Sequence, residues 1–205
     1  MPKPKQRTPA LAEQVLAAAQ GILARDGVAA LTARGLAAEA GTSPAAVYEL
    51  FGDKAGVVRA LFFAGFTQLG EALAPAADAD ADADPLERLV ALAQAYRRFV
   101  VERPALAAVM FSRPFASFDP APQEEAAGAA VRERIVAAVR HAVAAGRLQG
   151  DPTDLAHAFV ALVHGLAAAE SARRLGGSAA AIERRWDVSV RGLLRGFAPR
   201  VAEPA

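Results

Sequence analysis

Apolar residues recur every three or four positions through most of the chain, which is the spacing of a buried stripe along one face of an α-helix. Glycine, or a polar residue followed by proline, separates many of these stripes, and both signals are typical of helix ends. The predicted helices cover about residues 9–25, 32–40, 44–50, 54–73, 85–102, 105–112 and 123–145, and two more begin at Asp151-Pro152 and Ser178. The pattern therefore predicts an all-α protein of about nine helices.

Two short helices near the start of the chain are separated by a glycine turn. The first opens on a cap at Thr32 and is broken by Gly41, which favours the left-handed conformation after a helix end. Thr42-Ser43-Pro44 then supplies a new cap, with proline at the first helical position. This arrangement predicts a helix-turn-helix, whose second helix enters the major groove of DNA.

The flanking helices extend this motif on both sides. The helix at 9–25 is expected to pack across it and complete a three-helix N-terminal head. Asp53 caps the long helix at 54–73, which is continuous with the head while its body belongs to the rest of the chain. We therefore expect this helix to act as a lever between the two parts and to end at Pro75.

The last two helices of the chain carry the widest apolar faces. Such faces are suited to pairing with the same two helices of a second copy. The predicted dimerisation residues are Leu155, Phe159, Leu162, Leu166, Ile182, Trp186, Val190 and Leu193.

The helix-turn-helix residues resemble the TetR/AcrR family of bacterial transcriptional regulators. That family has threonine and arginine opening the first helix, Ala-Gly-Val-Ser in the turn, tyrosine late in the recognition helix, and then phenylalanine and lysine. The matching positions here are Thr32, Arg34, Ala40-Gly41-Thr42-Ser43, Tyr48, Phe51 and Lys54. Leu162-Val163-His164-Gly165-Leu166 is also similar to the C-terminal domain of a subgroup with a Trp-His-Gly motif, with Val163 replacing the tryptophan.

The resemblance implies a DNA-binding domain at 1–54 and an effector-binding and dimerisation domain at 55–205. The family often has Gly or Ala followed by Thr in the recognition helix, where this chain has Ala45-Ala46, and an aromatic residue or His where it has Leu50. Few polar base contacts are therefore expected, and the helix suits thymine methyl groups and phosphates. The predicted DNA contacts are Thr32, Arg34, Thr42, Ser43, Ala45, Ala46, Tyr48 and Lys54. Each also has a purely structural interpretation as a cap, a turn or a packed side chain.

Large apolar side chains gather in the part of the chain after the lever helix begins. They suit the lining of an apolar pocket for a small molecule, although a plain core needs the same residues. The predicted ligand-binding residues are Phe62, Phe66, Tyr96, Phe99, Met110, Phe111, Phe115, Phe118 and His164. Glu170 and Arg173 either orient a polar group of the ligand or pair with each other on the helix surface.

Composition narrows the class of protein. Alanine dominates and β-branched residues are sparse, which favours helices over sheets. The chain contains no cysteine, which excludes disulfides, zinc fingers and thiol catalysis. No secretory leader is visible, and the longest apolar run, Leu155 to Ala169, is too short to span a bilayer. We therefore expect a cytoplasmic protein without a membrane segment.

Charge gives a local signal only. The net charge is +1, so DNA affinity must come from the placement of individual basic groups. Lys3, Lys5 and Arg7 form a basic arm that either follows a phosphate backbone or minor groove, or is a solvated tail.

Metal sites and catalysis find little support. Asp78, Asp80 and Asp82 match the first ligand positions of a calcium loop, but Ala83 and Leu89 stand where its glycine and closing glutamate belong. Asp154, His157 and His164 give no compact set of three ligands. We expect no metal, no cofactor and no enzymatic activity, because no nucleophile with a base in reach and no paired carboxylates are visible.

The predicted function is a homodimeric transcriptional repressor that a small, largely apolar effector releases from an inverted-repeat operator. The alternative is a helical small-molecule-binding protein with weak or no sequence-specific DNA binding, because the recognition helix is unusually apolar.

Overall fold

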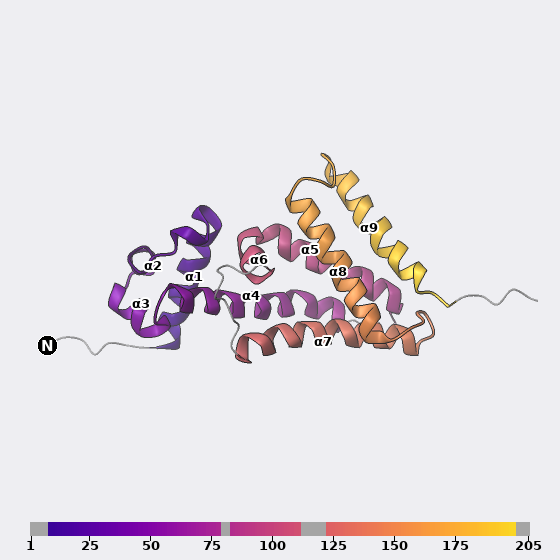
Figure 1. Ribbon diagram of the computed structural model, residues 1–205, viewed down its shortest axis with the longest axis horizontal. Helices are drawn as coiled ribbons and strands as arrows, with labels where there is room; N and C mark the ends of the chain where they lie inside the picture. The colour runs from indigo at the N-terminus through magenta and orange to yellow at the C-terminus, as the bar shows by residue number, and fades with distance from the viewer. Residues whose placement is uncertain (1–7, 79–82, 112–121, 200–205) are drawn as a thin grey trace, which may run out of the picture. The chain divides into compact units, whose positions relative to one another are not determined.

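The structure is a computed structural model that describes residues 8–78, 83–111 and 122–199. These residues form nine α-helices and one 3₁₀ turn, with no strand among them, which confirms the all-α prediction (Figure 1). The elements are α1 (Pro9–Asp26), η1 (Val28–Ala30), α2 (Ala33–Glu39), α3 (Pro44–Phe51), α4 (Lys54–Ala77), α5 (Pro85–Glu102), α6 (Pro104–Phe111), α7 (Pro122–Ala144), α8 (Pro152–Ser171) and α9 (Ala179–Gly196).

The chain divides into two compact units. The first contains residues 1–68 and 103–128, and the second contains residues 69–102 and 129–205. The division falls inside α4, whereas the sequence predicts a boundary at Lys54. α6 belongs to the first unit because it packs on α1 and on α4, where a Cβ at Gly65 would lie only 2.5 Å from the Met110 sulfur.

Polar side chains begin the helices at most of the predicted positions. Thr32 and Ser43 accept hydrogen bonds from the backbone N–H groups of Gly35 and Ala46 at 3.1 and 3.2 Å. These bonds satisfy donors that have no partner within their own helix. Asp53, Asp151 and Ser178 accept comparable bonds at the starts of α4, α8 and α9.

The prediction that Pro75 ends the lever helix is wrong. α4 continues through Pro75 to Ala77. A proline this close to the end removes only one backbone hydrogen bond, and the N–H of Asp78 still reaches the carbonyl of Ala74 at 2.8 Å. The last turn therefore closes around the proline.

The first unit contains the predicted three-helix head, in which α2 packs on both α1 and α3. The inward positions are nearly inaccessible to solvent, and include Val15, Ile22, Leu36, Ala37, Val47 and Val57. The amphipathic stripes of short helices thus converge on one core.

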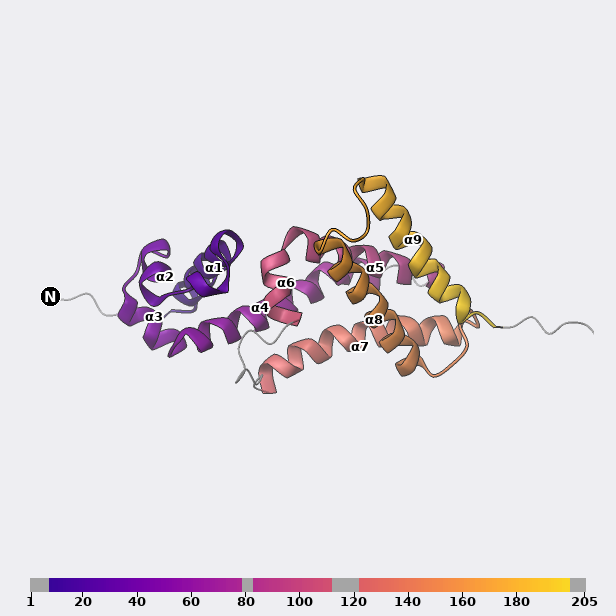
Figure 2. The ribbon, with the colours of Figure 1, turned by 45° about the horizontal axis from the view of Figure 1, so that its top comes forward.

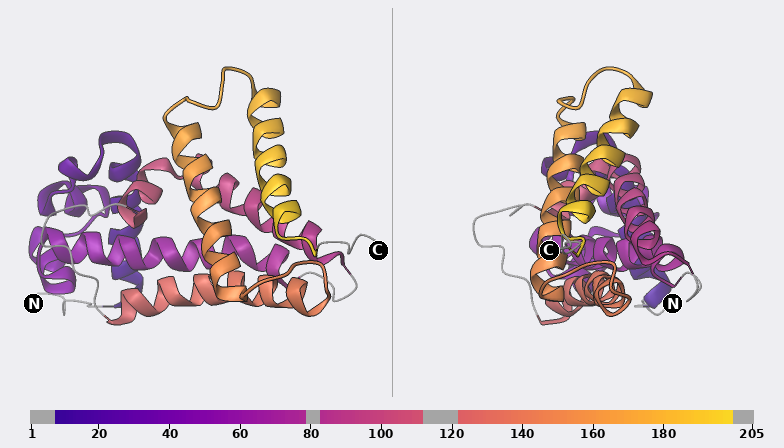
Figure 3. Two further views of the ribbon diagram at one scale, coloured as in Figure 1. Left: turned by 45° about the vertical axis from the view of Figure 1, so that its right-hand side comes forward. Right: turned by 90° about the vertical axis from the view of Figure 1, so that its right-hand side faces the viewer.

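The second unit is built on α5, α8 and α9, which contact one another pairwise. α8 and α9 run antiparallel as a hairpin (Figures 2 and 3). Trp186 of α9 is fully buried, and its indole N–H donates to Glu170 of α8 at 2.7 Å. Arg97 of α5 donates two hydrogen bonds to the same carboxylate, at 2.8 and 2.9 Å. One charged cluster, Arg97–Glu170–Trp186, therefore joins all three helices.

The Arg97–Glu170–Trp186 cluster corrects the interpretation of Glu170. Its carboxylate pairs with Arg97 and not with Arg173, which lies beyond the end of α8 with a φ of 57°. The helix ends too early for Arg173 to share its surface. Glu170 therefore connects α5, α8 and α9 within the second unit.

Candidate DNA-binding surface and effector region

The turn of the helix-turn-helix has the geometry that its glycine predicts. Gly41 has a φ of 63°, in the left-handed region that favours glycine. The N–H of Thr42 then donates to the carbonyl of Ala37 at 2.8 Å and closes the end of α2. Thr42 is half-buried in this turn, so its backbone has a structural role whatever its side chain contacts.

The recognition helix α3 exposes the side that the sequence predicts for DNA. Val47 faces the core and is 3% exposed, whereas Tyr48 is 57% exposed. Ala45 is exposed and Ala46 is half-buried. The exposed positions of α3 are therefore Pro44, Ala45, Tyr48 and Glu49, with polar groups only on the last two.

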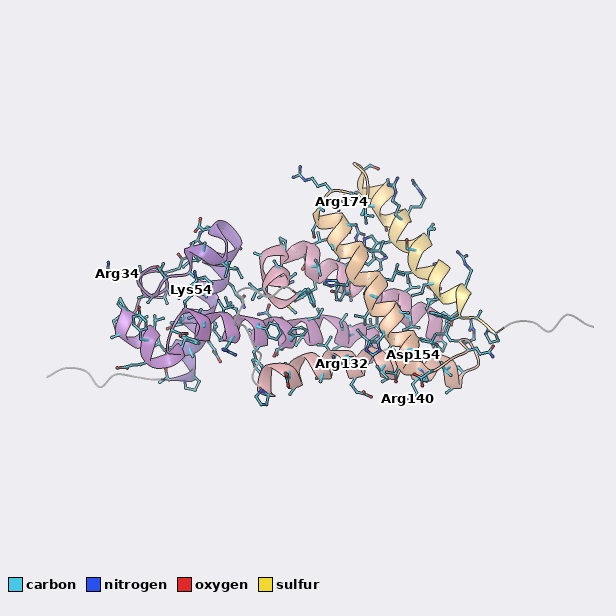
Figure 4. The ribbon with its side chains drawn as sticks, in the orientation of Figure 1. Arg34, Lys54, Arg132, Arg140, Asp154 and Arg174 are labelled. Carbon is cyan, nitrogen blue, oxygen red and sulfur yellow. The ribbon has the colours of Figure 1, made fainter. Side chains whose placement is uncertain are left out.

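Basic groups stand at the starts of the neighbouring helices. Arg34 projects from the first turn of α2 into solvent, and Lys54 begins α4 (Figure 4). Arg34 makes no ion pair within the described part of the chain, so its charge is available to a phosphate. Arg25, in contrast, donates two hydrogen bonds to Glu39 at 3.0 and 2.8 Å, and this contact lowers the pKa of Glu39.

Three predicted DNA contacts share one surface hollow in the head. The hollow has a volume of about 240 Å³. It is lined by Leu31, Thr32, Ala33, Leu36, Val47, Tyr48, Asp53, Lys54 and Val57. Thr32, Tyr48 and Lys54 supply its polar side chains together with Asp53, and its walls are apolar. The hollow therefore combines apolar walls with one cation, Lys54, and one carboxylate, Asp53.

Lys54 has a contact that no sequence pattern indicates. Its ammonium Nζ donates to the backbone carbonyl of Ala29 in η1 at 3.1 Å. The two residues are 25 positions apart, and the 3₁₀ turn itself is not predicted. Only the tertiary arrangement of the head brings them together.

The predicted ligand-binding residues are divided between the two units. Phe62, Phe66 and Phe111 form a half-buried aromatic cluster in the first unit. The ring centroids of Phe62 and Phe66 are 4.8 Å apart, and those of Phe66 and Phe111 are 5.8 Å apart. Met110 lies beside Gly65 in the same unit. Phe115 and Phe118 lie outside the described residues.

Tyr96, Phe99 and His164 belong to the second unit. Phe99 is 1% exposed, as a core residue is. The Tyr96 hydroxyl is hydrogen-bonded to Nδ1 of His164 at 3.0 Å, and burial raises the pKa of the tyrosine. This pair places polar atoms among apolar side chains in a region where the sequence predicts an effector.

Half of the predicted dimerisation residues are core residues of their own chain. Leu155, Phe159, Trp186 and Val190 are buried in the second unit and are not available to a partner. Leu162, Leu166, Ile182 and Leu193 are half-buried. The apolar stripes of α8 and α9 therefore face α5 and each other first. Val188, which the sequence analysis missed, is 57% exposed on the outer side of α9.

Histidines and apolar helices suggest no additional site. His157 is hydrogen-bonded through Nδ1 to the carbonyl of Thr153 at 2.8 Å, and no group of three or more potential metal ligands gathers among the described residues. Among the described residues, α4 is long and apolar enough to cross a membrane, judged by length and composition alone. This is weak evidence for a membrane span, because the core helices of water-soluble proteins share these properties.

Comparison with known proteins identifies both parts of the chain. Residues 15–61 match the family described as bacterial regulatory proteins, tetR family, and residues 89–193 match the tetracyclin repressor-like C-terminal domain. A comparison with curated proteins finds no match. A solved protein of unknown function from Rhodococcus sp. RHA1 is 32% identical, with a TM-score of 0.83 over 97% of this chain and 100% of that one.

Two more distant structures have the same fold. The TetR family transcriptional regulator PfmR from Thermus thermophilus is 22% identical, with a TM-score of 0.64 over 86% of this chain and 97% of its own. AibR, solved in complex with isovaleryl coenzyme A and operator DNA, is 16% identical, with a TM-score of 0.63 over 93% of this chain and 100% of its own.

The family match includes the helix-turn-helix, whose recognition helix is exposed and whose turn closes on Gly41. The second match extends from α5 into α9. The chain therefore belongs to the TetR family of bacterial regulatory proteins and is a DNA-binding transcriptional regulator.

Proposed function

We propose that this regulator is a cytoplasmic homodimeric repressor, released from an inverted-repeat operator when a small, largely apolar effector binds. The observation that carries the proposal is the head, where the exposed Tyr48 and Lys54 line one hollow and Arg34 is exposed in the first turn of α2. The proposal includes no catalytic step, in keeping with a family whose members are generally not enzymes. Two heads related by a two-fold axis read two half-sites about one helical turn apart or a multiple of it.

The outer faces of α8 and α9 are the surface that we assign to the dimer. Leu162, Leu166, Ile182 and Leu193 keep part of their surface, and Val188 is mostly exposed. A Cβ at Gly165 or Gly192 would meet no other atom within 4 Å, so helices of a second copy can approach closely there. Apolar side chains around small residues support close helix packing.

The effector is proposed to bind in the C-terminal domain. Among structures of the same fold, AibR is known in complex with isovaleryl coenzyme A and operator DNA. In this chain, the Tyr96–His164 pair of the second unit is one candidate contact. The aromatic cluster of Phe62, Phe66 and Phe111 in the first unit is a separate candidate. The first suits a polar group of the ligand and the second suits an apolar part.

Release requires the effector to prefer one conformation. α4 is the proposed lever, because it begins at the head and continues into the second unit. An effector that favours an α4 position with the two heads wrongly spaced lowers DNA affinity. Moving the population from mostly bound to mostly free requires a differential affinity of about 5 kcal/mol.

Selection of bound sequences from a random DNA pool tests the proposal. The purified protein is expected to enrich an inverted repeat at near-physiological salt. Enrichment of a single, non-repeated site would contradict the dimeric mode of binding. No enrichment by a folded dimer would instead support the alternative, a helical small-molecule-binding protein.

The charge on Arg34 is expected to contribute one phosphate contact. Arg34→Ala should reduce the slope of log affinity against log salt by about one, because each neutralised phosphate releases about one counterion. Operator titrations at four or five salt concentrations measure this slope. Glu13→Ala, on an exposed position of α1, is the control and should leave the slope unchanged. An unchanged slope in the Arg34 variant would remove this residue from the DNA contacts.

The dimer face is tested at Val188. Val188→Arg places a charge at the centre of the proposed interface and should weaken dimerisation at least tenfold, because a charge buried without a partner is costly. Sedimentation equilibrium measures the dissociation constant. Val101→Arg is the matched control, because Val101 is 50% exposed on α5 of the same unit. Equal effects of the two substitutions would argue against α9 as the interface.

A further inference from the structure

Lys54 connects two segments of the head that are distant in sequence. It is the first residue of α4, and its ammonium donates to the Ala29 carbonyl at 3.1 Å. In η1, the carbonyls of Gly27 and Val28 accept the N–H groups of Ala30 and Leu31. The carbonyl of Ala29 comes next and receives a cation instead. Lys54 therefore closes the end of the 3₁₀ turn, as basic side chains do at helix C-termini.

The turn that Lys54 holds leads directly into the DNA-binding motif. Leu31 follows η1 and is 1% exposed, and Thr32 then caps α2. Leu31, Thr32 and Lys54 all line the surface hollow of the head. The position of the Ala29 carbonyl thus bears on where α2 begins and where the polar rim of the hollow lies.

The ammonium has enough donors for two tasks. A lysine side chain has three N–H donors, and the bond to Ala29 uses one of them. Two donors therefore remain on an exposed side chain. A phosphate at the hollow can therefore be bound by an ammonium that the head already holds in place.

We infer that Lys54 is a positioning residue for DNA binding, which fixes the entry to α2 through the Ala29 carbonyl in addition to contributing its charge. This inference rests on DNA binding by the head, which the proposed function also uses. It differs from a simple phosphate contact in one measurable respect. Loss of a charge alone weakens binding less and less as salt rises, whereas loss of the bond to Ala29 weakens binding at every salt concentration.

Lys54→Met separates the two contributions, because methionine keeps much of the apolar stem and removes the charge and the donors. We expect its salt slope to fall by about one, as for Arg34→Ala. Affinity extrapolated to 1 M salt should also fall about three- to tenfold, which Arg34→Ala should not show. Lys54→Arg, which retains charge and donors, should recover most of the salt-independent loss.

Two outcomes of the titration would overturn the inference. A lower slope with unchanged affinity at 1 M salt would make Lys54 a phosphate contact only. Unchanged affinity at all salt concentrations, with the protein folded, would reduce the bond to a local stabilising contact. In both cases the wild-type protein binds operator, so the proposed function survives.

Hydrogen exchange tests the inference without DNA. In Lys54→Met, backbone amides between Ala30 and Leu36 should exchange faster than in the wild type, because the turn has lost its fixed end. Arg34→Ala should leave the amides of the turn before α2 unchanged. Equal exchange in the wild type and Lys54→Met would overturn the inference, even if no operator were found.

Discussion

Glu170→Ala is expected to destabilise the second unit by about 3 kcal/mol, the cost of removing one partner from a largely buried pair. Arg97 and the indole N–H of Trp186 both lose their acceptor. Side-chain exposure of the pair is 20% for Arg97 and 12% for Glu170, so water compensates only in part. Urea denaturation followed by tryptophan fluorescence measures the loss, because Trp186 is the single tryptophan of the chain.

Two control variants isolate the cause. Glu170→Gln keeps an acceptor for the indole and should cost less than the alanine variant. Glu133→Ala removes a carboxylate that is 67% exposed and pairs with Arg140, and it should change stability by less than about 1 kcal/mol. A Glu170→Ala effect as small as that of Glu133→Ala would show that the cluster contributes little.

Acid should reproduce part of the Glu170 effect. Burial raises the pKa of Glu170, but hydrogen bonds from Arg97 and Trp186 outweigh it and hold the pKa below its usual value. A carboxyl whose folded pKa is lowered contributes stability that is present above its unfolded pKa. This contribution is lost as pH falls through the folded pKa. The pH dependence below about pH 4.5 should therefore be weaker in Glu170→Gln than in the wild type.

Local signals predicted the fold well. Thr32, Ser43 and Asp53 are caps whose partners lie within three residues, so the sequence contains the whole interaction. The same holds for Gly41, whose positive φ follows from its place after a helix. The prediction at Pro75 was wrong because the cost of a proline depends on how many helical residues follow it.

Interactions between residues far apart in the chain could not be predicted from the sequence. Glu170 and Arg97 are 73 positions apart, and a near neighbour such as Arg173 is equally suitable from spacing alone. Periodicity likewise identifies apolar stripes on α8 and α9 but not what covers them. Trp186 and Val190 proved to be buried in their own chain, since a helix between two neighbours needs apolar residues on more than one side.

For the candidate DNA-binding surface too, the local features were predicted from the sequence and the contacts between distant residues were not. The exposure of Tyr48 and Arg34 agrees with the roles that the motif implies, although the contacts themselves remain predictions. The bond from Lys54 to Ala29 requires the 3₁₀ turn and the start of α4 to be placed in space. No pattern of residue types specifies that placement.

Val47→Asp is expected to abolish DNA binding by unfolding the head. Val47 is 3% exposed on the core side of α3, among the apolar walls of the hollow. A carboxylate at this position is almost completely removed from water, and burying it costs several kcal/mol. Operator affinity should fall more than a hundredfold.

A second aspartate variant distinguishes loss of DNA binding through unfolding from loss through charge repulsion. Ala45→Asp places the same carboxylate on the exposed side of α3, where it weakens DNA binding by repulsion but leaves stability nearly unchanged. Hydrogen exchange should show loss of protection in α1, α2 and α3 of Val47→Asp only, with α8 and α9 still protected, because they belong to the other compact unit. Loss of protection in both units would mean that the head and the C-terminal domain unfold together as one cooperative body. An effector that stabilises the C-terminal domain would then also stabilise the head, and it would change DNA binding without any lever motion of α4.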